Sequence, residues 1–423
     1  MLKQIGRRHT IAGILFFMPF LVAVDSLHEA RAQDLVRGET VTNRARPELD
    51  PLGIRMGGFL FFPQLGLAAK YDDNIFATNT NETDDTIYLL QPQIALRSNW
   101  NNHALNFVAG AEAAYYSEND SEDYIDSFIG ADMRLDASHD GQFSAAVMYS
   151  KLHQGRDSPD DQNGVEPTEY SLLAADAGYA HDFGLLSVEV GAALDRYDYD
   201  NNRLADNTPI INDDRDRDQT EASLRLGIDV SEAVELFVRG TYFVTSYVDE
   251  ADEFGRDRDS TGYEAVAGAA FDLTGVTFGE VFAGYRAQDP DDPAFDTIEG
   301  PQYGGALVWN PSGLTTVRGE VVRLVEETTE ANAPGYFSTT ANLTIDHELL
   351  RNLILGAGVG YSARKYDGID RNDSSRHGQL NAKYMMNRHL YVSLNYNYAD
   401  LDSNIVNEDY TKNVVMLRLQ AQY

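Results

Sequence analysis

The sequence predicts an all-β protein, a transmembrane antiparallel β-barrel with short periplasmic turns and long acidic extracellular loops. Two observations carry this prediction. Apolar and polar residues alternate over most of the chain, and short and long connections alternate between the resulting strands. In addition, no stretch after residue 32 approaches the roughly 18 consecutive apolar residues of a membrane-spanning helix.

The composition narrows the class of protein further. The chain has 423 residues, with 67 Asp and Glu against 33 Lys and Arg, a formal net charge of −34 and no cysteine. Such acidity argues against nucleic acid as a partner, because phosphate binding needs a basic surface. The missing cysteines exclude disulfides, thiolate metal sites and a cysteine nucleophile. A 43% hydrophobic fraction with 24 Tyr and 19 Phe argues against disorder.

The N-terminus has the pattern of an export signal. Lys3, Arg7 and Arg8 precede an apolar run over residues 11–24, and Ala30-Arg31-Ala32 supplies the small residues of a cleavage site. We therefore expect a signal peptide over residues 1–32, a periplasmic N-terminal segment over 33–57 and a barrel over 58–423.

The alternation has the period of a strand rather than of a helix. Within residues 388–400, for example, Leu390, Val392 and Leu394 share one face, whereas Ser393 and Asn395 lie on the other. An apolar face on every strand fits lipid on the outside of a barrel better than the core of a soluble sandwich or propeller.

The connections give the strand count. Eight short turns interleave with nine long loops, so that 17 connections join 18 strands, with 16 as the alternative count. An even number places both termini at the periplasmic rim. The predicted short turns are Trp100–Asn102, Ser138–Gly141, His181–Gly184, Ser231–Ala233, Leu273–Gly275, Asn310–Gly313, His347–Asn352 and Asn387–Arg388. The predicted long loops are 72–86, 117–124, 154–168, 199–216, 249–260, 288–299, 326–335, 367–374 and 401–409.

Assigning the polar face of each strand to the lumen predicts the residues that line it. They carry mixed charge, so that many acids and bases are able to pair across strands or to tune solute preference. The predicted lumen-lining residues are Arg97, Glu112, Asp132, Arg134, Glu189, Arg225, Asp229, Glu235, Arg239, Arg318, Glu320, Lys383, Tyr391 and Arg418. Tyrosines near strand ends, among them Tyr116, Tyr149 and Tyr197, are predicted to form aromatic rims at the membrane interfaces.

The acidic excess belongs to the loops, which hold more than half of all Asp and Glu. Carboxylates at a pore mouth concentrate cations and repel anions. We predict no metal site and no cofactor, because none of the acidic clusters has the spacing of a calcium loop. We also predict no enzyme activity: the histidines have neither a nucleophile-elbow serine beside them nor an HExxH spacing.

The last strand has the features of an insertion signal. Val415, Leu417, Leu419 and Tyr423 lie on one face, and the last residue is aromatic. This pattern resembles the C-terminal signal that outer-membrane barrels present to the barrel-insertion machinery, which we therefore expect as a partner together with outer-membrane lipids and lipopolysaccharide.

The opening strand carries a family resemblance. The segment GGFLFFPQLGLAAKYDDNIF, residues 57–76, is similar to the first strand of an outer-membrane β-barrel porin family associated with exopolysaccharide gene clusters. The matching motif is Tyr71, Asp72, Asp73, Asn74, Ile75 and Phe76. The resemblance implies a channel in the outer membrane of a Gram-negative cell that passes saccharide or exopolysaccharide, with periplasmic export proteins and a saccharide polymer as partners.

Three hypotheses for function follow. The first is a saccharide or polysaccharide export channel, which requires a wide lumen. The second is a general passive porin with cation preference, in which an inward-folded loop makes a constriction. The third is a structural or adhesive barrel whose lumen is closed by fully paired charges. An anionic polymer is disfavoured, because the predicted lumen has no excess of Arg and Lys.

Overall fold

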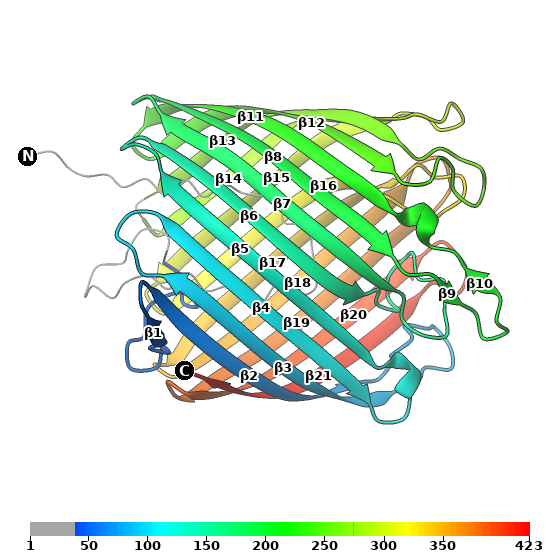
Figure 1. The fold of residues 1–423 in the computed structure, drawn as a ribbon, viewed down its shortest axis with the longest axis horizontal. Helices are drawn as coiled ribbons and strands as arrows, with labels where there is room; N and C mark the ends of the chain where they lie inside the picture. The colour runs from blue at the N-terminus through cyan, green and yellow to red at the C-terminus, as the bar shows by residue number, and fades with distance from the viewer. Residues whose placement is uncertain (1–38, 274) are drawn as a thin grey trace, which may run out of the picture.

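A computed structural model describes residues 39–273 and 275–423, and the predicted signal peptide lies outside them. Eighteen antiparallel strands form the barrel wall, which confirms the predicted count. Figure 1 shows them tilted steeply across the wall. In chain order they are β2 (Phe59–Asp72), β3 (Asp85–Ser98), β4 (Ala104–Tyr116), β5 (Tyr124–Asp136), β6 (Gly141–His153), β7 (Glu169–Asp182), β8 (Leu186–Tyr199), β11 (Arg217–Ser231), β12 (Val234–Tyr247), β13 (Ser260–Leu273), β14 (Thr277–Pro290), β15 (Ile298–Ser312), β16 (Thr315–Glu326), β17 (Tyr336–Leu350), β18 (Leu353–Tyr366), β19 (Asn372–Asn387), β20 (Leu390–Ser403) and β21 (Tyr410–Gln422).

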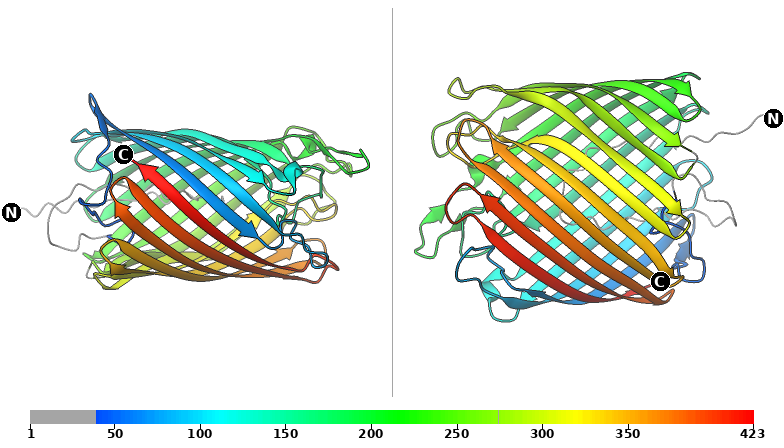
Figure 2. Two further views of the ribbon diagram at one scale, coloured as in Figure 1. Left: turned by 90° about the horizontal axis from the view of Figure 1, so that it is seen from below. Right: turned by 180° about the vertical axis from the view of Figure 1, so that it is seen from behind.

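The first and last strands close the wall. β2 pairs with β21 from Gln64 opposite Gln422 to Asp72 opposite Val414. Closure leaves no unpaired strand edge, which a strand inside a membrane requires because lipid supplies no hydrogen-bond partners. Figure 2 shows the two strands side by side, blue against red.

The two rims differ as the sequence predicts. The short turns gather at the end of the barrel where β1 and the C-terminus lie, and the long loops gather at the opposite end (Figure 1). Gly184 and Gly275 lie in two of the short turns with φ of 89° and 74°, a left-handed conformation that glycine adopts without strain. We refer to the short-turn end as the periplasmic rim and to the other as the extracellular rim.

Small elements decorate the rims. β1 (Ile54–Met56) pairs with the start of β2 at the periplasmic rim. At the extracellular rim lie the hairpin β9 (Asn202–Arg203) and β10 (Pro209–Ile210) and the 3-10 turns η1 (Asp120–Glu122) and η2 (Asp213–Arg215). No helix in the described ranges is both long and apolar enough to span a membrane.

The predicted motif at residues 71–76 stabilises the junction where β2 pairs with β21 to close the barrel, which we call the seam. Asp72 forms an ion pair of 3.0 Å with Lys412, and Asp73 accepts hydrogen bonds from the backbone and the side chain of Asn413 at 2.6 and 2.7 Å. Asn74 is fully buried and donates to the carbonyl of Thr411 at 3.0 Å. The motif thus joins the first strand to the last at the extracellular end of the barrel.

Candidate functional site: the lumen and its two mouths

The inner face of the wall carries the polar residues. On β11 and β12, Arg225 lies opposite Arg239 and Asp229 opposite Glu235, which places all four on one face. The alternate residues of β11, Leu224, Leu226 and Ile228, are exposed on the other face, toward lipid. The strand register places the other predicted lumen-lining residues on the inner face in the same way.

A cluster of charged residues lines the lumen along β8 to β14. The Arg225 guanidinium forms ion pairs with Glu235 at 2.7 Å, with Glu189 at 3.2 Å and with Glu280 at 3.7 Å. It also lies over the ring of Phe237, 4.2 Å from the centroid. This cluster brings together three of the predicted residues.

Arg239 extends the charged cluster toward β13. It forms an ion pair with Glu264 at 3.3 Å and lies over the ring of Phe282 at 4.8 Å. The acid partners Glu264 and Glu280 were absent from the predicted set. The lumenal face carries glycine and alanine on β13 and Phe278 and Phe282 on β14, which makes the apolar–polar alternation of both strands weak in the sequence.

The remaining predicted residues lie apart from this cluster. Glu112 accepts hydrogen bonds from Tyr124 at 2.7 Å and from Gln91, and Asp132 accepts one from Asn106 at 2.8 Å. Further pairs are Arg134 with Asp136 at 3.2 Å, Arg318 with Asp346 at 2.5 Å, Arg97 over Phe62 at 5.3 Å and Lys383 over Tyr391 at 4.4 Å. Glu320 and Arg418 face the lumen from β16 and β21.

The middle of the inner wall along β18 to β20 is mostly uncharged and polar. Gln379 lies opposite Asn397, and Asn381 lies opposite Asn395, on neighbouring strands β19 and β20. His377 forms a hydrogen bond of 2.9 Å with Asn342 of β17. Amide and hydroxyl groups of this kind hydrogen-bond to sugar hydroxyls as well as to water.

Three glycines make room for these amide side chains. Gly356, Gly358 and Gly360 of β18 lie opposite Asn381, Gln379 and His377. A Cβ at each glycine would collide with the polar side chain opposite, at 2.2 Å for Asn381 and 2.6 Å for Gln379. The polar side chains therefore lie flat across β18 rather than project into the lumen, which leaves space along this wall.

The prediction that tyrosines near strand ends form aromatic rims at the membrane interfaces is wrong for Tyr116 and Tyr197. Tyr197 is buried, and the guanidinium of Arg217 lies over its ring at 4.3 Å on the inner face. Tyr116 is half-buried and lies opposite the buried Ile87, also on the inner face. Both residues stand at the extracellular ends of their strands, where loops cover the lumen and make the inner face less polar.

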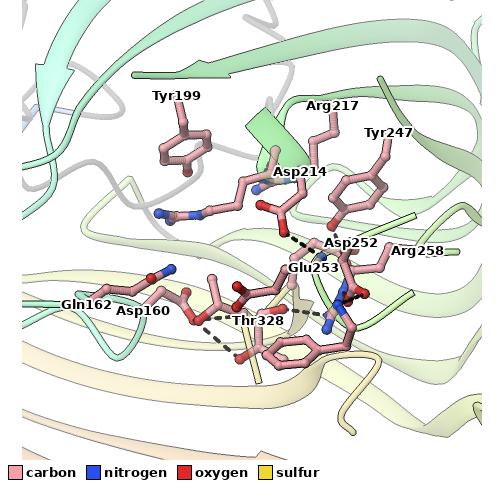
Figure 3. Close-up of a pocket in the computed structure, with 14 residues that line it drawn as sticks. Asp160, Gln162, Tyr199, Asp214, Arg217, Tyr247, Asp252, Glu253, Arg258 and Thr328 are labelled. Carbon is pink, nitrogen blue, oxygen red and sulfur yellow. Dashed lines mark hydrogen bonds and ion pairs between the residues drawn. The ribbon is translucent and has the colours of Figure 1, made fainter. Parts of the chain in front are cut away.

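A loop crosses the extracellular mouth. The Asp160 carboxylate in loop 154–168 accepts hydrogen bonds from the backbone of Thr329 at 3.0 Å and from the hydroxyl groups of Thr329 and Thr328 at 3.1 and 3.3 Å. Loop 154–168 joins β6 to β7, whereas loop 326–335 joins β16 to β17, nearly half-way around the wall. The contact therefore bridges the mouth (Figure 3).

Arginines hold both loops in place. Arg156 binds both carboxylate oxygens of Glu122 at 2.8 Å and forms an ion pair with Asp161 at 3.3 Å. Burial raises the pKa of the Asp161 carboxyl, and the guanidinium of Arg156 opposes that rise. Arg258 is buried, forms an ion pair with Asp252 at 2.7 Å and donates to three carbonyls of loop 326–335.

The space enclosed by these loops is small. The cavity in Figure 3, lined by Asp160, Tyr199, Arg217, Tyr247 and Arg258 among others, has a volume of about 50 Å³. That volume holds only a few water molecules. The loops in this arrangement form a cap over part of the mouth rather than a pocket for a solute.

The periplasmic mouth holds the start of the described chain. Residues 39–50, which we call the N-terminal strap, lie against inward-facing side chains of β16 to β20. Val41 is 3% exposed and packs with Ile354 and Met385. The sequence predicts a periplasmic segment over residues 33–57, and the structure places residues 39–50 of it inside the rim.

A closed wall of eighteen strands, apolar outside and polar inside, defines an outer-membrane β-barrel of the porin type. The chain belongs to the family described as "Putative beta-barrel porin 2", whose model matches residues 46–423. The outer membrane is therefore its location, as the sequence predicts.

Solved structures of distant similarity are also outer-membrane barrels. A mutant of the ferric enterobactin receptor PfeA from Pseudomonas aeruginosa is 6% identical, covering 86% of this chain and 80% of that chain, with a TM-score of 0.47. OpdK from the same organism, solved with vanillate, is 11% identical, covering 86% and 99%, with a TM-score of 0.45. OccAB4 from Acinetobacter baumannii is 12% identical, covering 87% and 99%, with a TM-score of 0.45. A comparison with curated proteins finds no match.

The charged cluster predicts an effect on ion selectivity. We expect Arg225→Gln to leave Glu189, Glu235 and Glu280 without their shared cation and to raise the preference of the pore for cations over anions. The reversal potential under a salt gradient in planar bilayers measures this preference. Arg376→Gln is the control, because Arg376 is 65% exposed on the outer face. An equal reversal potential in both variants would show that ions do not pass the Arg225 cluster.

Proposed function

We propose that this protein is a passive outer-membrane channel for small hydrophilic solutes, with short saccharides as the favoured class. The observation that carries the proposal is the bridge from Asp160 to Thr328 and Thr329, because a loop held across the mouth limits the size of what passes. The amide-lined wall of β18 to β20 supports uncharged polyhydroxyl solutes. The acidic loops favour cations among the ions.

Export of an exopolysaccharide chain is the second candidate, favoured by the motif at residues 71–76. Passage of a polymer requires the bridge at the extracellular mouth to open, and it requires periplasmic export proteins to deliver the chain. A closed structural barrel is the third, favoured by the ion pairs around Arg225 and Arg239. Under all three we propose that lipid and lipopolysaccharide cover the outer face and that the barrel-insertion machinery engages β21.

Solute entry into liposomes tests the first candidate against the others. We expect purified protein to admit monosaccharides rapidly and to admit longer oligosaccharides progressively more slowly. Asp160→Ala removes the bridge and should shift the size limit toward longer chains. Glu166→Ala is the matched control, because it removes the same charge from an exposed position of the same loop.

The outcomes separate the three candidates. Absence of both sugar entry and ion conductance contradicts an open channel and favours the structural barrel. Equal entry of short and long oligosaccharides into liposomes with unmodified protein contradicts a size limit at the bridge and favours polymer passage.

A further inference from the structure

The N-terminal strap is attached to the inside of the periplasmic mouth by several polar contacts. The amide of Val41 donates to the hydroxyl of Thr316 at 2.9 Å, and Arg318 donates to the hydroxyl of Thr42 at 2.8 Å. Asn310 donates to the carbonyl of Glu39 at 2.8 Å. All these wall residues lie on β15 and β16 near the periplasmic rim, so that one end of the strap is fixed there.

A single carboxylate carries much of the attachment. Glu348, near the end of β17, accepts hydrogen bonds from Arg44 at 2.6 Å and from Arg46 at 2.7 Å. Glu348 is 6% exposed and Arg46 is 3% exposed, so this ion pair is shielded from water. Arg46 also donates to the carbonyl of Val41 at 2.7 Å, which folds the strap back on itself. Glu348 therefore holds both arginines of the strap, and through Arg46 it also supports the fold back to Val41.

The strap is attached without being part of the wall. Strand pairing begins only at β1, where Ile54 lies opposite Phe61. Among the described residues, the strap's hydrogen bonds from backbone to backbone are internal, such as those from Arg44 to Thr40 and from Leu49 to Arg46. In its hydrogen bonds with the wall, the donor, the acceptor or both belong to a side chain. Release of the strap therefore breaks none of the strand ladder that holds the barrel closed.

We propose that the N-terminal strap is a releasable gate that narrows the periplasmic mouth of the channel. In its attached state it covers the inner ends of the six neighbouring strands β15 to β20 on one side of the rim, and it excludes solute from that part of the opening. In its released state the cross-section of the mouth grows to the full width of the wall. The Glu348 carboxylate is the group that holds the attached state.

A reversible cross-link tests the gate. The chain contains no cysteine, so the pair Val41→Cys and Thr316→Cys creates a single disulfide between strap and wall. Oxidation should trap the attached state, seen as a change in gel mobility that reductant reverses. We expect a lower unitary conductance in planar bilayers when oxidised and a rise on reduction. Each single-cysteine variant is the control and should not respond to reductant.

A second variant tests the role of Glu348 without a cross-link. Glu348→Gln keeps the shape of the side chain but removes the charge that two arginines share, and it should give the larger conductance without reductant. Failure of the cross-link to form overturns the proposed attachment. A disulfide that forms but leaves the conductance equal in the oxidised and reduced states overturns the gate.

Discussion

Replacing Arg156 by alanine should detach loop 154–168 from the barrel mouth, at a cost of about 3–5 kcal/mol to the stability of the folded loop. The guanidinium is 6% exposed, and its partners Glu122 and Asp161 are 4% and 5% exposed. Alanine leaves two shielded carboxylates without a cation, and it also removes the hydrogen bond to the carbonyl of Gly164 at 2.9 Å. The loop then loses the ion pairs that position Asp160 for its contacts with Thr328 and Thr329 on the opposite side of the mouth.

Hydrogen exchange of the backbone amides in loop 154–168 measures this loss. We expect exchange there to accelerate by about two to three orders of magnitude, since each 1.4 kcal/mol is about tenfold, while amides in the β-strands remain protected. The conductance should rise together with the exchange, because the bridge at the mouth opens.

Arg256→Ala is the matched control for Arg156→Ala. Arg256 also lies in an acidic loop, but it is 36% exposed and 3.7 Å from Asp292. A surface pair of this kind contributes about 0–1 kcal/mol, so exchange in its loop should change little. If both variants have the same effect, the loops are held by their overall charge balance rather than by the buried pair.

The wall of the barrel was predictable from the sequence for a local reason. The lipid-facing side of each strand must be apolar, and successive residues of a strand point to opposite faces of the wall. Apolar residues therefore recur at every second position, as at Leu224, Leu226 and Ile228. Turns such as Trp100–Asn102 and Ser231–Ala233 interrupt that period and mark the strand ends, whereas β15 continues to Ser312 through most of the predicted turn Asn310–Gly313. The strand number was confirmed because these signals recur in every hairpin.

The mouths were not predictable in the same way. The contact of Asp160 with Thr329 joins residues 169 positions apart, and that of Arg46 with Glu348 joins residues 302 apart. No periodic pattern specifies contacts between loops on opposite sides of a ring. The available signal was an arginine inside an acidic loop, as at Arg156 and Arg258, because the few cations of such a loop have many carboxylates within reach.

Replacing Asn74 by alanine should weaken the seam where the barrel closes. The Asn74 amide donates to the carbonyls of Thr78 at 2.7 Å and Thr411 at 3.0 Å, and its side-chain oxygen accepts from the backbone of Thr78 at 3.0 Å. Alanine leaves buried backbone groups without partners, each at a cost of about 1–3 kcal/mol. The seam is the one place where β2 meets β21, so no neighbouring hairpin compensates.

The temperature at which the SDS-resistant folded barrel unfolds measures the strength of the seam. We expect a clear decrease for Asn74→Ala and little change for Asn397→Ala, because Asn397 is exposed on the inner face and such positions usually tolerate substitution within about 0.5 kcal/mol. Unchanged unfolding of Asn74→Ala would mean that the β2–β21 ladder alone closes the barrel. The motif at residues 71–76 would then have to act outside the seam, in the extracellular loop that it begins.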